Sequence, residues 1–389
     1  MARKLRYGMV GGGPGAFIGA VHRSAIALDG QAVLVAGAFS SDPAKSREQG
    51  HELGISESRT YDTYEQMASV EKSLPADQRI DFVSIVTPNN THFPVAKTFA
   101  EHGFHIVCDK PMTTTLADAL ELSHVVREAG VIFALTHNYT GYPMVKEARH
   151  IVHAGELGII KKVVVEYPQG WLSTLVEDDG QKQASWRTDP KIAGAGALGD
   201  IGSHAENLVR YITGLRIAEM CADVSTIVPG RLVDDDANIL VHYEGGARGI
   251  IYCSQVSVGE ENALNVRIYG TKGAIEWDQE SPNSLILKRQ SEPTSVLRAG
   301  QPYLSEAAQS STRLPPGHPE GFIEAFANIY QNAIGAMSAL DQGLPLEELD
   351  LEYPDIDDGI LGMHFIESAL KSGRERRWID ASYELESER

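Results

Sequence analysis

Three side chains combine types and spacings that suit acid–base chemistry on an oxygen atom. Lys110 follows an apolar run that ends at Cys108, which predicts a lysine at the carboxyl end of a buried strand, where parallel sheets bind ligands. Its ammonium group would hydrogen-bond a reacting oxygen and stabilise developing negative charge. Asp200 and His204 are four residues apart and would share one face of a helix, where an imidazole that titrates near neutrality can exchange a proton. The structural alternatives are a solvated surface lysine and a capping aspartate beside a buried histidine.

A glycine-rich turn near the start of the chain has the spacing of a dinucleotide phosphate site. The G-x-G-x-x-G/A pattern lies between a strand-like and a helix-like run. The missing side chains would let backbone N–H groups and the helix terminus approach a pyrophosphate. A tight turn without a ligand is the alternative. We predict cofactor contacts from Gly11, Gly13, Pro14, Gly15, Ala16 and Phe17.

The residues after the second apolar run bear on which dinucleotide would bind. A carboxylate usually holds the adenosine ribose at the end of the second strand. Ser40 stands at that position and Ser41 follows it, while Lys45 and Arg47 are the nearby cations that could meet a 2′-phosphate. We predict cofactor contacts from Ser40, Ser41 and Lys45, with NAD favoured and NADP left open.

Strand-like and helix-like runs alternate through the first third of the chain, and they would position the glycine turn and Lys110. This alternation requires a parallel sheet with right-handed crossovers, so a Rossmann domain is predicted over residues 1–136. Strands are predicted over 5–10, 32–39, 80–86, 104–108 and 132–136, and helices over 16–28, 92–102 and 116–129.

The pattern changes after residue 136, where strand-like runs follow one another with glycine-containing turns. This succession predicts a largely antiparallel sheet in a second α/β domain over 137–389, which would carry the substrate site. A Ser- and Pro-rich stretch over 281–316 is expected to be a long surface excursion, and the C-terminal helix is a candidate to pack back on the first domain. Strands are predicted over 162–167, 238–243, 247–256, 263–269 and 273–277, and helices over 144–154, 321–339 and 357–371.

Composition narrows the class of protein further. The 389 residues are 42 % hydrophobic and 22 % charged, as in an ordinary soluble globular protein. The chain has 34 Lys and Arg against 53 Asp and Glu, and its net charge of −19 disfavours nucleic acids and anionic membranes as partners. The three cysteines have no CxxC spacing, which argues against a disulfide framework or a zinc site. We expect a cytoplasmic protein without a membrane span or metal.

Three further motifs follow one another along the chain, Thr87-Pro88-Asn89-Asn90-Thr91-His92, Cys108-Asp109-Lys110-Pro111 and Gly199-Asp200-Ile201-Gly202-Ser203-His204. In this order they resemble the family of glucose-fructose oxidoreductase, inositol dehydrogenase and rhizopine-catabolism proteins, abbreviated Gfo/Idh/MocA. The resemblance spans nearly the whole chain. It implies a Rossmann domain followed by an α/β domain with an open, mainly antiparallel sheet that meets the cofactor and often serves in oligomerisation. A homo-oligomer, dimer or tetramer, is therefore expected.

The resemblance also implies roles for the candidate acid–base residues. Lys110 would be catalytic, His204 would accept the hydroxyl proton and Asp200 would contact the substrate, while the carbinol carbon gives a hydride to the nicotinamide C4. The Glu-Lys-Pro of the family is replaced by Asp109-Lys110-Pro111, which has a shorter acid.

The resemblance also implies site roles for Asn138 and for the Trp186-Arg187 pair, and aromatic and polar side chains of the second domain add further candidates. Asn89 and His92 have turn and packing roles as alternatives to cofactor contact, and Tyr139 stands where many family members carry an arginine. The further predicted cofactor contacts are Thr87, Pro88, Asn89, His92, Asp109, Lys110, Asn138, Trp186 and Arg187. The predicted substrate contacts are Lys110, Tyr139, Gln169, Trp171, Arg187, Asp200, His204 and His318.

The leading hypothesis is an NAD(P)-dependent oxidoreductase that oxidises a secondary hydroxyl of a sugar, a sugar derivative or an inositol. One alternative is an NAD-dependent glycoside hydrolase that oxidises transiently, eliminates the aglycone and reduces the sugar back. Another is a sugar and dinucleotide sensor without catalysis, which the presence of both Lys110 and His204 disfavours. The sequence does not distinguish the dehydrogenase from the glycoside hydrolase, and it does not identify the sugar.

Overall fold

The computed structural model describes residues 3–346, 349 and 351–385, which form two compact units. The first unit runs to Thr113, continues over Ala117–Asn138 and ends with Phe322–Ile360. The second unit contains Thr114–Leu116, Tyr139–Gly321 and the chain from Leu361 onward. The first unit thus takes up a segment from far along the chain, whereas the expected division used a single cut after residue 136. That division and the packing of the C-terminal helix stay predictions.

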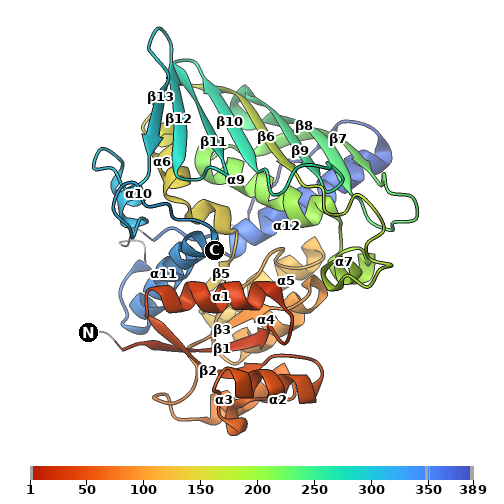
Figure 1. Ribbon diagram of the computed structural model, residues 1–389, viewed down its shortest axis with the longest axis vertical. Coiled ribbons are helices and arrows are strands. Elements are labelled where there is room, and N and C mark those ends of the chain that lie inside the picture. Colours follow the sequence, from red (N-terminus) through yellow and green to blue (C-terminus); the bar gives the residue numbers. More distant parts are fainter. Residues whose placement is uncertain (1–2, 347–348, 350, 386–389) are drawn as a thin grey trace. The chain divides into compact units, whose positions relative to one another are not determined.

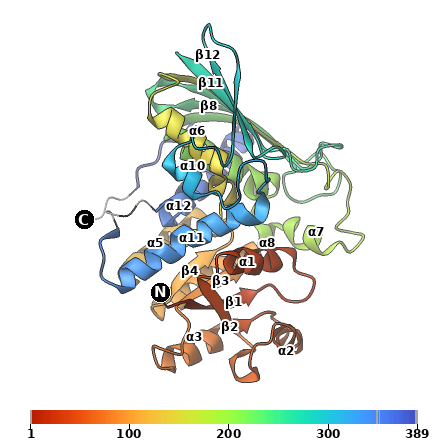
Figure 2. The ribbon, with the colours of Figure 1, turned by 60° about the vertical axis from the view of Figure 1, so that its left-hand side comes forward.

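The first unit contains a five-stranded parallel sheet of the Rossmann type, in the order β2-β1-β3-β4-β5 (Figure 1; Figure 2 labels β4). A helix or a longer connection separates successive strands, as parallel pairing requires. The strands are β1 (Leu5–Gly11), β2 (Ala32–Ala38), β3 (Phe82–Val86), β4 (His105–Cys108) and β5 (Phe133–Leu135). The helices are α1 (Phe17–Leu28), α2 (Pro43–Glu52), α3 (Tyr64–Ser73), α4 (His92–Glu101), α5 (Leu116–Ala129) and α11 (Phe322–Asp341). The predicted Rossmann fold is confirmed.

A buried polar cluster lies within the apolar core that α1 and α11 form with the sheet. His22 of α1 is fully buried, and its Nδ1 lies 2.7 Å from the hydroxyl oxygen of Tyr330 in α11. That hydroxyl lies 2.8 Å from Oγ of Ser84 in β3. Burial lowers the pKa of His22 to about 4, so its imidazole is neutral at pH 7.

The low pKa of His22 predicts a loss of stability in mild acid. Between about pH 6.5 and pH 4 the unfolded state binds a proton that the folded state does not, so the free energy of unfolding falls as pH falls. From pH 7 to pH 5 this group accounts for about 2 kcal/mol. Urea unfolding at both pH values should show a smaller pH dependence in His22→Gln than in wild type. The exposed His51→Gln serves as the control, and equal pH dependence in both variants would contradict the prediction.

The second unit contains a nine-stranded sheet in the order β13-β12-β11-β10-β6-β9-β8-β7-β14. Among the described strands every neighbouring pair is antiparallel except β6 and β9, so the mainly antiparallel sheet is confirmed. Helices α6 (Pro143–His153) and α9 (Ser203–Thr213) pack on it, and Figure 2 shows α6 on one face of the sheet. The strands are β6 (Ile160–Pro168), β7 (Ile217–Ser225), β8 (Asp236–Tyr243), β9 (Arg248–Ser254), β10 (Asn265–Gly270), β11 (Gly273–Asp278), β12 (Ser284–Arg289), β13 (Ser295–Arg298) and β14 (Ile379–Asp380).

The expectation of a long surface excursion over 281–316 is wrong. Strands β12 and β13 extend the sheet, and a short helix, α10 (Glu306–Ser310), follows them. Leu285 and Leu287 are buried because they alternate with outward-facing residues on a strand. The Ser- and Pro-rich composition of the whole stretch hides this short alternation.

The remaining helices are α7 (Lys182–Arg187), α8 (Pro190–Ala193) and α12 (Ile356–Glu375). Within the described part of the chain, each helix is too short or too polar to cross a lipid bilayer.

Candidate functional site

The glycine turn after β1 has the shape of a phosphate cradle. Gly11 has a φ of +87°, which favours glycine. A Cβ on Gly13 would lie 2.7 Å from the carbonyl oxygen of Phe39, and a Cβ on Gly19 would lie 2.5 Å from the Cα of Gly12. Because backbone atoms occupy the space that these side chains would need, the turn closes tightly against the end of β2 and the first turns of α1.

The start of α1 leaves its first N–H groups without a side-chain cap. The residue before the helix, Ala16, makes no capping hydrogen bond, and Phe17 begins the helix with 65 % of its surface exposed. Uncapped N–H groups at a helix N-terminus favour an anionic group. Pro14 and Gly15 lie between the glycine turn and this terminus, with Gly15 at a φ of +72°.

Replacing Gly19 by alanine should therefore weaken dinucleotide binding. Alanine favours a helix by about 1 kcal/mol over glycine, but here its Cβ would push the helix away from Gly12. We expect the dissociation constant for NADH to rise at least about tenfold in a fluorescence titration. Gly362→Ala is the matched control, since Gly362 also lies in a helix and a Cβ there would meet no neighbouring part of the described chain within 4 Å. Unchanged NADH affinity in Gly19→Ala would contradict the cradle.

Two buried polar atoms beyond the sheet lack hydrogen-bond partners among the described residues. They are Oγ1 of Thr87, directly after β3, and Nδ2 of Asn138, shortly after β5. Buried polar atoms are usually satisfied, so these two suit a polar ligand at the carboxyl ends of the strands. Pro88 is exposed and Asn89 is buried at the start of a 3-10 turn. Together with the glycine cradle, these features fit a dinucleotide.

The polar side chains that follow β2 make hydrogen bonds with the backbone of their own turn. Ser40 Oγ accepts a hydrogen bond of 3.1 Å from the backbone N–H of Asp42. Asp42 caps α2, because its Oδ1 accepts from the backbone N–H groups of Ala44 at 2.9 Å and Lys45 at 3.4 Å. Ser41 and Lys45 are exposed. The carboxylate two residues after Ser40, that of Asp42, therefore caps a helix.

Asp109 fixes the backbone that carries Lys110. Its Oδ1 accepts hydrogen bonds of 2.9 Å from the hydroxyl of Thr136 and from the backbone N–H of Lys110. The carboxylate thus joins the segments that follow β4 and β5. Lys110 is half-buried, and its peptide bond to Pro111 is cis.

His92 lies in a packing position, which is the structural alternative to the predicted cofactor contact. The side chain is 1 % exposed, with Nδ1 2.7 Å from the carbonyl oxygen of Pro111 and Nε2 2.9 Å from that of Thr87. Burial lowers the pKa of His92. The ring therefore bridges the turns after β3 and β4, and both nitrogens already face protein carbonyls.

In the second unit, Asp200 and His204 follow one another along a continuous helical segment. Asp200 lies in a π-helical turn, Leu198–Gly202, which leads directly into α9 and His204. Such turns are rare and are frequent at functional sites. The carboxylate of Asp234 accepts hydrogen bonds of 2.7 Å from the N–H groups of Gly196 and Leu198, and so holds the start of this segment. A Cβ on Gly196 would lie 1.8 Å from the carbonyl oxygen of Asp234, so only glycine allows this approach.

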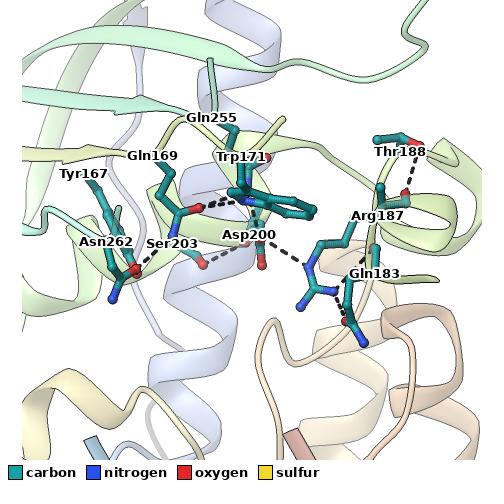
Figure 3. Close-up of polar contacts among 12 residues, drawn as sticks. Tyr167, Gln169, Trp171, Gln183, Arg187, Thr188, Asp200, Ser203, Gln255 and Asn262 are labelled. Atoms are coloured by element: carbon teal, nitrogen blue, oxygen red, sulfur yellow. Dashed lines mark hydrogen bonds and ion pairs between the residues drawn. The ribbon is translucent and has the colours of Figure 1, made fainter. Parts of the chain in front are cut away.

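The carboxylate of Asp200 lies in a cluster of polar side chains (Figure 3). Gln255 Nε2 donates a hydrogen bond of 2.9 Å to Asp200 Oδ2, and Arg187 Nε lies 3.4 Å from the same oxygen. Trp171 Nε1 donates to Gln169 Oε1 at 3.0 Å. Side chains from the ends of β6 and β9 thus meet one from α7 at the π-helical turn.

Neighbouring side chains hold Arg187 in this position. Its Nη1 donates to Gln183 Oε1 at 2.5 Å, one turn earlier in α7. Its guanidinium carbon lies 4.2 Å from the centre of the Trp186 ring, a cation–π contact. Of the two predicted residues, Arg187 therefore contacts Asp200 directly, and Trp186 contacts Arg187.

A closed ring of hydrogen bonds lies on the other side of Gln169. Asn262 Oδ1 accepts from Tyr167 at 2.6 Å and from Gln169 at 2.8 Å, and Asn262 Nδ2 donates to the hydroxyl of Tyr139 at 3.2 Å. The two tyrosine hydroxyls are 2.5 Å apart. Burial raises the pKa of both tyrosines, so both phenols stay protonated at neutral pH. The Tyr139 ring packs edge-on against His204, with centroids 4.8 Å apart.

His318 lies apart from this cluster in the contacts that the structure records for the described residues. It is exposed, and its Nδ1 lies 3.1 Å from the carbonyl oxygen of Pro315. A local loop role explains this contact.

Three amide side chains that the sequence did not mark as site residues complete the cluster: Gln183, Gln255 and Asn262. Gln169 and Gln255 both follow strands that end at the same sheet edge, since β6 and β9 are parallel neighbours. The same rule that singled out Lys110 applies here. The rule could not be applied to the sequence alone. No local pattern shows that β6 and β9, which lie about 80 residues apart in the chain, are neighbours in the sheet.

Comparisons with known proteins give the same two-part organisation. Residues 5–137 match the model of an oxidoreductase family with an NAD-binding Rossmann fold, and residues 145–276 match the Gfo/Idh/MocA C-terminal domain. The chain is 35 % identical to the uncharacterized oxidoreductase YfiI of Bacillus subtilis, over 98 % of each chain.

Solved structures of an inositol dehydrogenase homolog from Azotobacter vinelandii share the fold over 98 % of each chain. The complex with NAD+ has a TM-score of 0.94 at 36 % identity. The complex with NADH and myo-inositol has a TM-score of 0.92 at 35 % identity. The first unit therefore carries an NAD-binding Rossmann domain.

Proposed function

Because the chain belongs to the Gfo/Idh/MocA family of NAD-binding oxidoreductases, we propose that it oxidises a secondary hydroxyl of a sugar, a sugar derivative or an inositol. The similarity to a homolog bound to NADH and myo-inositol supports a polyhydroxylated substrate.

The observation that carries the proposal is the polar cluster around Asp200. Amide, carboxylate, guanidinium and indole N–H groups gather there, and an amide offers both donors and acceptors. A ring with several hydroxyl groups needs such paired donors and acceptors. The positive charge of Arg187 is balanced by Asp200, so the cluster carries no excess charge for an anionic group.

Two residues of the chain supply the proton chemistry in this proposal. His204 accepts the proton of the hydroxyl that is oxidised, because a neutral imidazole can take it near pH 7. The ammonium group of Lys110 hydrogen-bonds the same oxygen and stabilises the negative charge that develops as the proton leaves. NAD supplies the hydride acceptor when bound.

The glycine cradle, Thr87 and Asn138 would hold the dinucleotide. Asp200 would orient the substrate by accepting from one of its hydroxyls, and Arg187 and Gln255 would keep the carboxylate in place. Positioning of this kind lowers the entropic barrier of the reaction.

A substrate panel tests the proposal. Purified protein with NAD is incubated with inositols, aldoses, alditols and glycosides, while NADH absorbance is followed at about 340 nm and products are identified by NMR. We expect NADH and one ketone or lactone product in equal amounts with at least one polyol or sugar. Release of an aglycone without net NADH would favour the glycoside hydrolase, and sugar binding without any turnover would favour the sensor.

A further inference from the structure

Arg231 has a fully buried side chain whose guanidinium group is completely bonded, although it lies outside the Asp200 cluster. Its Nε and Nη2 donate to the Glu177 carboxylate at 3.0 and 3.1 Å, and Nη1 lies 3.2 Å from Asp235 Oδ2. Nη1 also donates to the carbonyl of Leu172 at 2.6 Å, and Nη2 to that of Thr174 at 2.7 Å. The guanidinium has five N–H groups, and each meets an acceptor.

The loop that carries Arg231 is itself held rigid by the two carboxylates that follow it. Asp235 accepts hydrogen bonds from the backbone N–H groups of Ile227 at 2.7 Å and Val228 at 3.0 Å. Asp234 holds Gly196 and Leu198, at the start of the π-helical turn, through the contacts already described. We refer to residues 226–235 as the anchor loop.

The anchor loop therefore contacts both segments that carry the Arg187–Asp200 ion pair. The segment 172–177, bound by Arg231, follows Trp171 and leads into α7. The Gln181 side chain caps α7 by accepting from the N–H of Ala184 at 2.5 Å. Asp234 binds the second segment at Leu198, which lies two residues before Asp200.

We propose that Arg231 is a positioning residue which, with Asp234 and Asp235, sets the place of Arg187 relative to Asp200 and thereby the affinity for substrate. The statement about substrate rests on the proposed function, whereas the statement about position does not. A bidentate arginine–carboxylate pair fixes direction as well as distance, so it can hold a polar segment that has few apolar contacts. Over residues 177–183 the chain is largely exposed and mostly polar, which leaves it few other means of fixation.

Glu177 is the partner to change, because removal of Arg231 would leave the buried carboxylate of Asp235 without its arginine and put folding at risk. Burial raises the pKa of Glu177, but the Arg231 guanidinium and a backbone N–H outweigh it and leave this pKa below its usual value. Glu177→Gln keeps the shape of the side chain and removes its charge. Glu156→Gln is the matched control, since Glu156 also pairs with an arginine of the second unit, Arg289.

The experiment is hydrogen–deuterium exchange of the full-length wild type and both variants, with steady-state kinetics beside it. In Glu177→Gln we expect amides of residues 173–187 to exchange at least about tenfold faster, while the strands of the sheet keep their rates. We expect KM for the sugar or polyol to rise about fivefold or more, with kcat and the dissociation constant for NADH within about twofold of wild type. Glu156→Gln should match wild type in every measurement.

Three results would overturn the inference. These are unchanged exchange over 173–187, an equal acceleration throughout the second unit, and faster local exchange without any change in KM. If no compound of the panel is turned over, the proposed function fails, but the exchange rates still decide whether Arg231 and Glu177 fix the segment.

Discussion

Replacing Lys110 by alanine is expected to lower kcat at least about a hundredfold, the largest effect of any single cation in the chain. The ammonium group is assigned to the oxygen on which negative charge develops, so its loss acts on the transition state more than on the bound ground state. The Asp109 carboxylate and Thr136 already fix the backbone at this position, which a side-chain truncation leaves intact. We therefore expect the dissociation constant for NADH to change by less than about tenfold.

Controls separate the loss of this ammonium group from a general loss of charge. Lys97→Ala removes a partly exposed lysine of the same unit, which pairs with Glu121, and should keep full activity. Lys110→Arg keeps the positive charge and should recover part of the rate, because its planar group cannot reproduce the point charge of an ammonium. A kcat near that of wild type in Lys110→Ala would rule out the assigned role.

His204→Gln is expected to lower kcat/KM at least about a hundredfold and to change its pH dependence. The wild-type profile should rise with pH as the essential imidazole loses its proton, and this limb should vanish in the variant. Glutamine fills similar space beside Tyr139 but cannot accept the proton. The stopped-flow rate of NADH formation across a pH series measures both effects.

A rescue experiment and a control variant complete the test of His204. High concentrations of free imidazole should restore part of the rate of a His204→Ala variant, because alanine leaves room for the ring at this buried position. His242→Gln, on β8 and paired with Glu219 at 3.0 Å, should behave as wild type. An unchanged pH profile in His204→Gln would show that another group takes the proton.

The Rossmann strands could be predicted because their signals are local. An apolar run, a glycine turn and a helical period follow one another within about 25 residues, as in β1 and α1. Helix α2 escaped prediction because it is strongly polar and buries only Ser46, Gln49 and Gly50. Helix α11 was predicted as a helix, but no local pattern shows that it packs with strands more than 200 residues earlier.

The candidate site shows the same limit. Motif spacing found Asp200 and His204, because both lie on one continuous helical segment. The π-helical turn itself depends on Asp234, a residue 34 positions later than Asp200, whose carboxylate holds the start of that segment. Gln255 and Arg231 likewise act through tertiary contacts, and their residue types are too common to mark a site.

Isotope transfer tests the central claim, the oxidation of a carbinol by NAD, most directly. A substrate found in the panel is synthesised with deuterium on the carbinol carbon and incubated with the enzyme and unlabelled NAD. We predict one deuterium on C4 of the nicotinamide for each molecule of oxidised product, measured by mass spectrometry and NMR. Deuterium that stays in the sugar product or exchanges into water, with NAD returned unlabelled, would contradict the account.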